Sequence, residues 1–212
     1  KPLTPTLSPG GRGGYFFKTR FCYRFFAKFR WLSRAGFALV LLLGAGVLSL
    51  RAETPVSKEY QVKAVFLFNF AQFVKWPRAA FTRENEPFRI GILGEDPFDA
   101  FLDETVKGEK VDGHPLLIRR CNGIEDAKNC QIVFVSRSES QRMENILAGL
   151  KGRNILTVSD TEGFIKSGGI VRFVTEGNKV HFRINPEAAK RVKLAISSKV
   201  LRLAEIAQPG QD

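Results

Sequence analysis

The feature that most constrains the fold is a series of short apolar segments alternating with helical patterns between residues 88 and 158. Its centre is Gln131–Ser136, a nearly continuous apolar run typical of a strand buried on both faces of a sheet. The other predicted strands are Phe88–Leu93, Leu116–Arg120 and Asn154–Val158, and the predicted helices are Pro97–Val106, with Asp96 as N-cap, and Ser138–Leu150. This order predicts an α/β fold with three layers, in which helices flank both faces of a mainly parallel sheet.

The last third of the chain has a different pattern. Ile170–Thr175 and Lys179–Ile184 read as strands, and the turn sequence at 176–178 suits an antiparallel hairpin between them. Asn185 is placed to cap a final helix from Pro186 to about Ile206, because apolar residues recur there at helical spacing. We therefore expect a C-terminal antiparallel hairpin followed by one helix.

A helical pattern also opens the domain, from a capping Ser57 to Trp76, where Pro77 ends it. This helix is apolar on more than one face, so it is either buried on both sides or in contact with a partner. The aromatic residues that we assign to a partner surface are Phe66, Phe70, Phe73 and Trp76. The alternative, which applies most to Phe66 and Phe70, is that these side chains belong to the core.

Residues 1–52 have the pattern of an export leader. A basic stretch ends at Arg34, an apolar run extends from Ala35 to Leu50, and the small residue Ala52 precedes a polar segment. The apolar run is short for a permanent anchor, so we predict a signal peptide cleaved after Ala52, with an uncleaved inner-membrane anchor as the alternative. Residues 1–14 are rich in Pro and Gly and resemble spurious upstream sequence. We place a single domain at 53–212, with its core at 59–206.

The leader also accounts for most of the net charge of the chain, which is +12. It holds nine of the 33 basic residues and no acidic one, which leaves 24 basic residues against 21 acidic ones, a net charge of +3. A nearly neutral domain gives no electrostatic reason to expect nucleic acid as a partner.

The cysteines fit an exported domain. Cys22 lies in the leader, so the domain keeps Cys121 and Cys130 on either side of a polar loop. In an oxidising compartment we expect these two to pair as a disulfide. The alternative is two free thiols, with Cys130 buried at the start of a strand and Cys121 exposed in the loop. A metal site is not expected, because the two histidines lie far from the cysteines in sequence.

No arrangement of residues indicates an enzyme. The segment Gly91–Gly94 lacks the glycine and lysine patterns of a phosphate-binding loop, and no serine or cysteine has a triad context. We therefore expect neither catalysis nor a cofactor. Ligands of open parallel sheets bind at the carboxyl ends of the strands, so Gly94, Ser136 and Asp160 could line a small-ligand crevice.

The assembled motifs resemble those of the YfiR family. They are Tyr60–Pro77, Phe88–Gly94, Cys130–Ser136, Leu156–Asp160 with Gly163 and Phe164, Gly168–Phe173 and Val180–Asn185. They occur in the family's order and span nearly the whole domain.

The resemblance implies a small periplasmic α/β regulator. Such proteins hold an inner-membrane diguanylate cyclase of the YfiN type inactive through protein contact, which lowers cyclic-di-GMP and biofilm formation. It also implies disulfides and a homodimer. We therefore expect a regulator whose partner is a membrane diguanylate cyclase or sensor kinase. The alternative is a periplasmic small-ligand-binding protein that feeds a sensor kinase or a transport complex.

Overall fold

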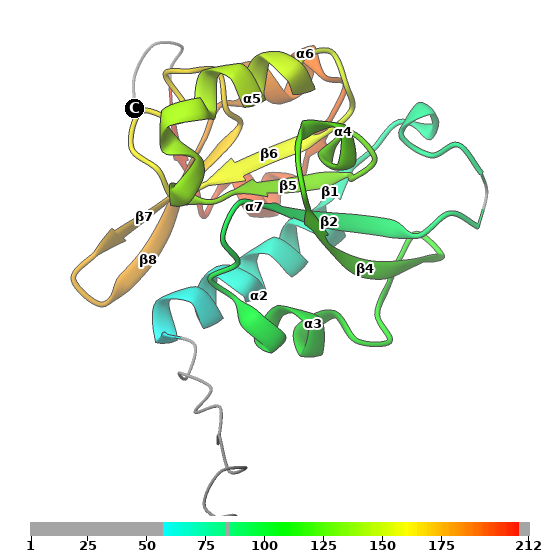
Figure 1. Cartoon of the computed structure of the whole chain (residues 1–212), viewed down its shortest axis with the longest axis horizontal. Coiled ribbons are helices and arrows are strands. Elements are labelled where there is room, and N and C mark those ends of the chain that lie inside the picture. The colour runs from blue at the N-terminus through cyan, green and yellow to red at the C-terminus, as the bar shows by residue number, and fades with distance from the viewer. Residues whose placement is uncertain (1–56, 84, 208–212) are drawn as a thin grey trace, which may run out of the picture. The chain divides into compact units, whose positions relative to one another are not determined.

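The computed structural model describes residues 57–83 and 85–207 (Figure 1). The predicted leader, its cleavage site at Ala52 and the segment 1–14 lie outside these residues. They therefore stay predictions.

The centre of the described domain is an eight-stranded sheet. Its strands, in spatial order, are β10 (Glu205–Ile206), β8 (Lys179–Ile184), β7 (Val171–Glu176), β6 (Leu156–Ser159), β5 (Ile132–Val135), β2 (Phe88–Leu93), β4 (His114–Cys121) and β3 (Lys110–Val111). The neighbours from β4 through β2, β5 and β6 to β7 are parallel, whereas β7–β8 and β3–β4 are antiparallel. The predicted α/β class, the mainly parallel sheet and the hairpin are confirmed.

Helices cover both faces of the sheet (Figure 1). The helices α2 (Lys58–Phe73) and α3 (Asp99–Val106) lie on one face, and α4 (Ile124–Ala127) and α5 (Met143–Leu150) lie on the other. Strand β5 shows how one sequence serves both layers. Ile132 and Phe134 join the core cluster on the α2 side, while Val133 and Val135 join the cluster on the α5 side. This division explains the continuous apolar run in the sequence.

Several predicted boundaries shift. Helix α2 starts as predicted, with Ser57 Oγ accepting from the Tyr60 N–H at 3.4 Å, but it ends at Phe73. The next residues form β1 (Val74–Lys75), which pairs antiparallel with β9 (Ala195–Ile196), and then the 3₁₀ turn η1 (Arg78–Ala80). Asp96 accepts from the Phe98 N–H at 2.8 Å instead of capping α3. The segment predicted as one helix before Leu150 is the 3₁₀ helix η2 (Arg137–Arg142) followed by α5.

The prediction of a single final helix from Pro186 to Ile206 is wrong. Asn185 does cap a helix, since its Oδ1 accepts from the Ala188 N–H at 2.9 Å, but that helix, α6 (Pro186–Arg191), is short. Lys193 has a φ of 58°, a left-handed conformation that ends helical geometry. The chain then forms β9, the short helix α7 (Ser198–Leu201) and β10. Pairing of β9 with β1 and of β10 with β8 replaces the helical hydrogen bonds.

Candidate functional site

A buried charged network lies where β5 and β6 end. The two strands are parallel neighbours, with Val135 opposite Ser159, so the residues that follow them leave the sheet at the same edge. One of these is Asp160, a residue that the sequence predicted at a ligand crevice. Its side chain is only 1% exposed. A carboxylate this deeply buried requires compensating donors.

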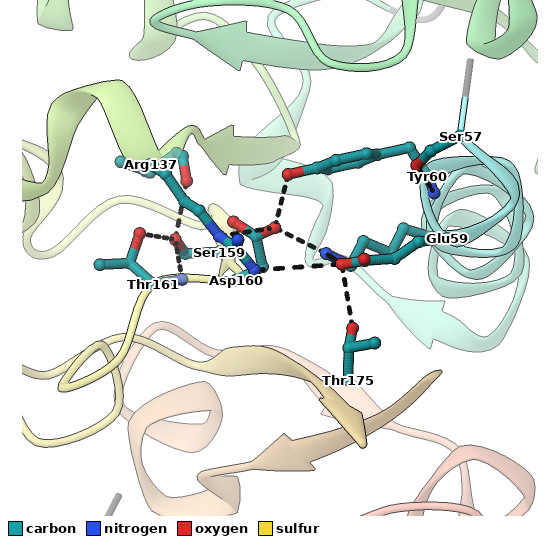
Figure 2. A network of polar contacts seen from close by, with 10 residues as sticks. Ser57, Glu59, Tyr60, Arg137, Ser159, Asp160, Thr161 and Thr175 are labelled. Carbon is teal, nitrogen blue, oxygen red and sulfur yellow. Dashed lines mark hydrogen bonds and ion pairs between the residues drawn. The ribbon is translucent and has the colours of Figure 1, made fainter. Parts of the chain in front are cut away.

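One oxygen of Asp160 receives three such donors. Its Oδ2 accepts from the Tyr60 hydroxyl at 2.9 Å and from Lys63 Nζ at 2.6 Å, both on α2. Arg137 Nε, at the start of η2, lies 3.2 Å from the same oxygen. Figure 2 shows the α2 side chains approaching Asp160 from one side and Arg137 approaching it from the other. Asp160 therefore joins α2 to the loop after β5.

Lys63 is the cation at the centre of the network. Its side chain is fully buried, and it bonds both Asp160 and Glu59, the residue one turn earlier on α2. Glu59 also accepts from the Thr175 hydroxyl on β7 at 2.9 Å. A buried ammonium is tolerated only when it is paired and hydrogen-bonded, and here two carboxylates provide that pairing. The first turns of α2 are thus fixed to both β6 and β7.

The network shifts the protonation of two of its members. Partial burial acts to raise the pKa of Glu59, but the hydrogen bonds from Lys63 and Thr175 outweigh it, so the pKa lies below its usual value. Burial raises the pKa of Tyr60, and the neighbouring negative charge of Asp160 raises it further. At neutral pH Glu59 is therefore ionised and Tyr60 keeps its proton to donate.

The other two crevice residues, Gly94 and Ser136, follow β2 and β5 at the same sheet edge. Gly94 has a φ of 95°, and a Cβ added to it would come within 2.5 Å of Ser138 Oγ. Ser138 also accepts from the Glu95 N–H at 2.9 Å, so its side chain fills this position. Ser136 is buried. Neither residue is among those that line the pocket beside Asp160, so their part in a ligand crevice stays a prediction.

A pocket of about 380 Å³ is present beside Asp160. We call it the Asp160 pocket, and its lining residues are Arg137, Ser140, Asp160, Thr161, Glu162 and Arg172. Sequence reasoning missed Arg137, and it also missed Glu59, Tyr60 and Lys63. One signal was available, since Lys63 falls on the same helical face as the apolar Ala64 and Leu67, where a lone lysine is unexpected.

The four aromatic residues assigned to a partner surface divide between core and surface. Phe70 is 1% exposed and belongs to the core. Phe66 is partly buried, and its ring centroid lies 5.0 Å from that of Phe182 in an edge-to-face contact. Trp76 is also partly buried and donates from Nε1 to the Gln131 carbonyl at 3.2 Å. Phe73 alone of the four is substantially exposed, at 38%.

Two valines that the sequence analysis did not assign to this surface are exposed with Phe73. Val62 is 42% exposed and Val65 is 44% exposed. The three residues follow one side of α2, and we call them the α2 row. The Phe73 end of the row lies beside the segment between β9 and α7, because the Ser197 N–H donates to the Phe73 carbonyl at 3.0 Å. The α2 row is an apolar strip on the helix whose opposite face carries Lys63.

The two cysteines lie together on the α5 side of the sheet. Both are buried free thiols, and their sulfur atoms are 4.0 Å apart. Gly91 on the intervening strand makes room for them, because a Cβ there would come within 2.8 Å of Cys130 Sγ and 3.1 Å of Cys121 Sγ. The hydrogen bond between the thiols lowers the pKa of Cys121 and, together with burial, raises the pKa of Cys130. The expected disulfide is not formed in this structure.

The described residues hold neither a metal-binding cluster nor a membrane-spanning helix. Within 57–83 and 85–207, no group of three or more histidine, cysteine or acidic side chains is arranged to hold a metal ion. In the same part of the chain, no helix has the length and apolar character needed to cross a membrane.

Comparison with known proteins agrees with the motifs. A family model described as YfiR/HmsC-like matches residues 60–205, and this confirms the resemblance seen in the sequence. A comparison with curated proteins finds no match.

Proposed function

We propose, because the chain belongs to the YfiR/HmsC-like family, that it is a periplasmic regulator acting by protein contact. Its partner is an inner-membrane diguanylate cyclase, which it holds inactive, so that it lowers cyclic-di-GMP and biofilm formation. The protein itself performs no catalysis and needs no cofactor. Export by the leader at 1–52 brings the domain to the compartment in which the periplasmic region of such a cyclase is accessible.

The observation that carries this proposal is the α2 row. Three apolar side chains, each between 38% and 44% exposed, follow one side of a helix that is otherwise well packed. Exposed apolar residues that share one side of a helix are typical of contact surfaces, and burying them against a partner is favourable. The partner surface assigned from the sequence is thereby revised to Val62, Val65 and Phe73. Phe66 and Trp76 contribute only their exposed edges.

We also propose that Cys121 and Cys130 form a disulfide in the oxidising periplasm. Both thiols lose a proton and an electron to the thiol oxidants of that compartment, and the S–S bond forms. Their adjacency in the fold supports this pairing. Mass spectrometry of the exported protein under non-reducing conditions tests it, with a mass lower by two hydrogens as the expected result and two alkylatable thiols as the contradicting one.

Capture of the membrane partner tests the α2 row. The tagged protein, expressed from the full chain, should co-purify a diguanylate cyclase from solubilised membranes, and both Val65→Glu and Phe73→Glu should abolish capture. Leu117→Glu is the matched control, because Leu117 is an exposed apolar residue (49%) on β4. Capture that persists in both α2 variants would overturn the surface assignment. Size-exclusion chromatography of the same variants reports whether the row instead holds a homodimer.

A second candidate function rests on the Asp160 pocket. In this alternative the protein binds a small ligand in the periplasm and feeds a sensor kinase or a transport complex. A ligand that binds only the folded state raises the midpoint of thermal unfolding. Co-purification of a kinase or transporter in place of a cyclase would favour this alternative.

A further inference from the structure

The Asp160 carboxylate has one buried oxygen without a donor. Its Oδ2 is held by Tyr60, Lys63 and Arg137, whereas its Oδ1 is buried and accepts no hydrogen bond from a described residue. Figure 2 shows the dashed contacts of Asp160 gathered on one oxygen. A buried acceptor without a donor destabilises the folded state, so Oδ1 requires a donor that the described residues do not supply.

The Asp160 pocket is polar throughout. Each of its six lining residues carries a charged or hydroxyl-bearing side chain, and none is apolar. Its volume of about 380 Å³ lies within the range of small-molecule sites. Sites for drug-like molecules are lined mainly by hydrophobic and aromatic side chains, which this pocket does not have. The lining therefore favours a small polar ligand.

The charges around the pocket balance. The cations are Lys63, Arg137 and Arg172, and the anions are Glu59, Asp160 and Glu162. Lys63 bonds both Glu59 and Asp160, and Arg137 lies 3.2 Å from Asp160 through Nε and 3.9 Å from Glu59 through Nη2. A ligand with a net charge of either sign would disturb this balance, which is unfavourable at short distance. The ligand that fits best has no net charge.

The pocket wall offers both donors and acceptors. Thr161 Oγ1 accepts from Ser159 Oγ at 3.1 Å, so the hydroxyl of Thr161 can itself donate. Ser140 is exposed, and its hydroxyl can donate and accept. The carboxylates of Asp160 and Glu162 accept only. A ligand group that both donates and accepts therefore matches the whole wall.

We infer that the Asp160 pocket binds an uncharged polyhydroxy compound, that is, a sugar or another polyol. One ligand hydroxyl donates to Asp160 Oδ1, and neighbouring hydroxyls exchange hydrogen bonds with Ser140, Thr161 and Glu162. A hydroxyl supplies the missing donor without adding charge. This inference rests on the second candidate function proposed above, because it names the class of ligand that the pocket takes.

A zwitterion fits less well, although its net charge is also zero. Its ammonium group would have to approach Asp160 Oδ1, while Lys63 Nζ lies 2.6 Å and Arg137 Nε 3.2 Å from the other oxygen of the same carboxylate. The two cations already there would repel a third. Amino acids are therefore controls and not expected ligands.

Binding requires a side chain of the pocket to move, because Oδ1 is buried. Arg137 is suited to this movement. Its side chain is 59% exposed, and its contact of 3.2 Å is the longest of the three that Asp160 Oδ2 makes. Lys63 is fully buried and keeps the carboxylate in place when Arg137 moves.

Nuclear magnetic resonance titration of the isotope-labelled protein, expressed from the full chain, tests the inference. The probes are D-glucose, D-ribose, myo-inositol and glycerol. D-gluconate, D-glucosamine and L-serine are controls for negative, positive and zwitterionic charge, and permethylated D-glucose is the control that accepts but does not donate. We expect at least one probe to shift the amide signals of Asp160, Thr161 and Glu162 with a Kd in the millimolar range or below. Every control should bind at least about tenfold more weakly than that probe.

Two exposed serines of η2 provide matched variants. Ser140→Ala removes a hydroxyl from the pocket wall and should weaken binding about threefold, as expected for the loss of an uncharged hydrogen bond. Ser138→Ala should leave binding unchanged, since Ser138 does not line the pocket. Amide spectra of the ligand-free variants check that both keep the fold.

Four results would overturn the inference. They are no shift with any probe, a charged or permethylated control that binds as tightly as the best probe, shifts confined to residues away from the pocket, and equal binding by the two serine variants. A charged ligand that raises the midpoint of thermal unfolding would keep the second candidate function while excluding polyols, so the two failures are distinguishable. No membrane partner is present in this experiment, so its failure leaves the capture test of the α2 row unaffected.

Discussion

The first turns of α2 meet the sheet through charged groups, whereas its last turns meet it through aromatic rings. At the start, Lys63 bonds Asp160 at 2.6 Å, and the side chains of both residues are buried. Toward the end, the Phe70 ring centroid lies 5.1 Å from that of Phe182 and 5.9 Å from that of Phe173. Both attachments are buried, yet they depend on different conditions.

The difference teaches which end of the helix can be regulated. Aromatic packing depends on apolar contact area, and pH or small anions change it little. The charged attachment depends on the ionised state of Glu59, whose pKa lies below its usual value, and on the pairing of Lys63 with Asp160. A change in pH therefore acts on the first turns of α2, while the aromatic contacts of its last turns keep the helix on the sheet.

Removal of the central members of each attachment should have the largest effect. We expect Phe70→Ala and Lys63→Ala each to lower the free energy of unfolding by about 3–5 kcal/mol at pH 7, the first through a cavity and the second through unpaired buried carboxylates. Urea unfolding measures both, with Lys58→Ala as the control because Lys58 is exposed. A loss below about 1 kcal/mol for Lys63→Ala would contradict the charged attachment.

Lowering the pH should reduce the loss of stability in Lys63→Ala and leave the loss in Phe70→Ala nearly unchanged. The Lys63→Ala penalty should shrink as the pH falls below 4.5, because the part of it that comes from ionised Glu59 is lost there, while the Phe70→Ala penalty should persist. The same urea experiment repeated at pH 3 measures this. Equal penalties at both pH values would mean that Lys63 acts through packing and not through charge.

Replacing Glu59 should lower the free energy of unfolding by a smaller amount, and this loss should depend on pH. Its pKa in the folded protein lies below the ordinary value of 4.5, so its stabilising contribution is complete above pH 4.5 and is lost as the pH falls through the folded value. We expect Glu59→Gln to cost about 1 kcal/mol at pH 7 and progressively less in acid. Thermal unfolding from pH 7 to pH 3 measures the difference. A cost that grows in acid would reverse the sign and contradict the account.

The α2 row should contribute least to stability. Val65 is 44% exposed, so Val65→Glu should change the free energy of unfolding by no more than about 0.5 kcal/mol. The same variant should lose partner capture. If Val65→Glu were strongly destabilised, the row would belong to the fold, and loss of capture would carry no information about the surface.

The sequence was sufficient for the sheet because its strands are separate apolar runs with turn residues between them. It was insufficient for the final segment, where apolar spacing compatible with a helix is shared by α6, β9 and α7. The left-handed Lys193 and the pairing of β9 with β1 depend on tertiary contacts that local patterns do not contain. Periodicity alone could not distinguish these outcomes.

The site was likewise predictable only as far as it follows from the strand pattern. Asp160 follows a buried strand, and this places it at the ligand edge of a parallel sheet. Its pairing with Lys63 spans 97 positions and exists only because α2 packs across the strand ends. The space beside Gly94 is likewise filled by Ser138, which lies 44 positions later in the chain. Sequence reasoning located the edge, and packing determined which residues meet there.

Cellular cyclic-di-GMP tests the central claim most directly. Deletion of the gene should raise its concentration, and complementation with the wild-type chain or with Leu117→Glu should restore it. Complementation with Val65→Glu should leave it high, although that variant folds normally. An unchanged concentration after deletion, or full restoration by Val65→Glu, would contradict a regulator that acts through the α2 row.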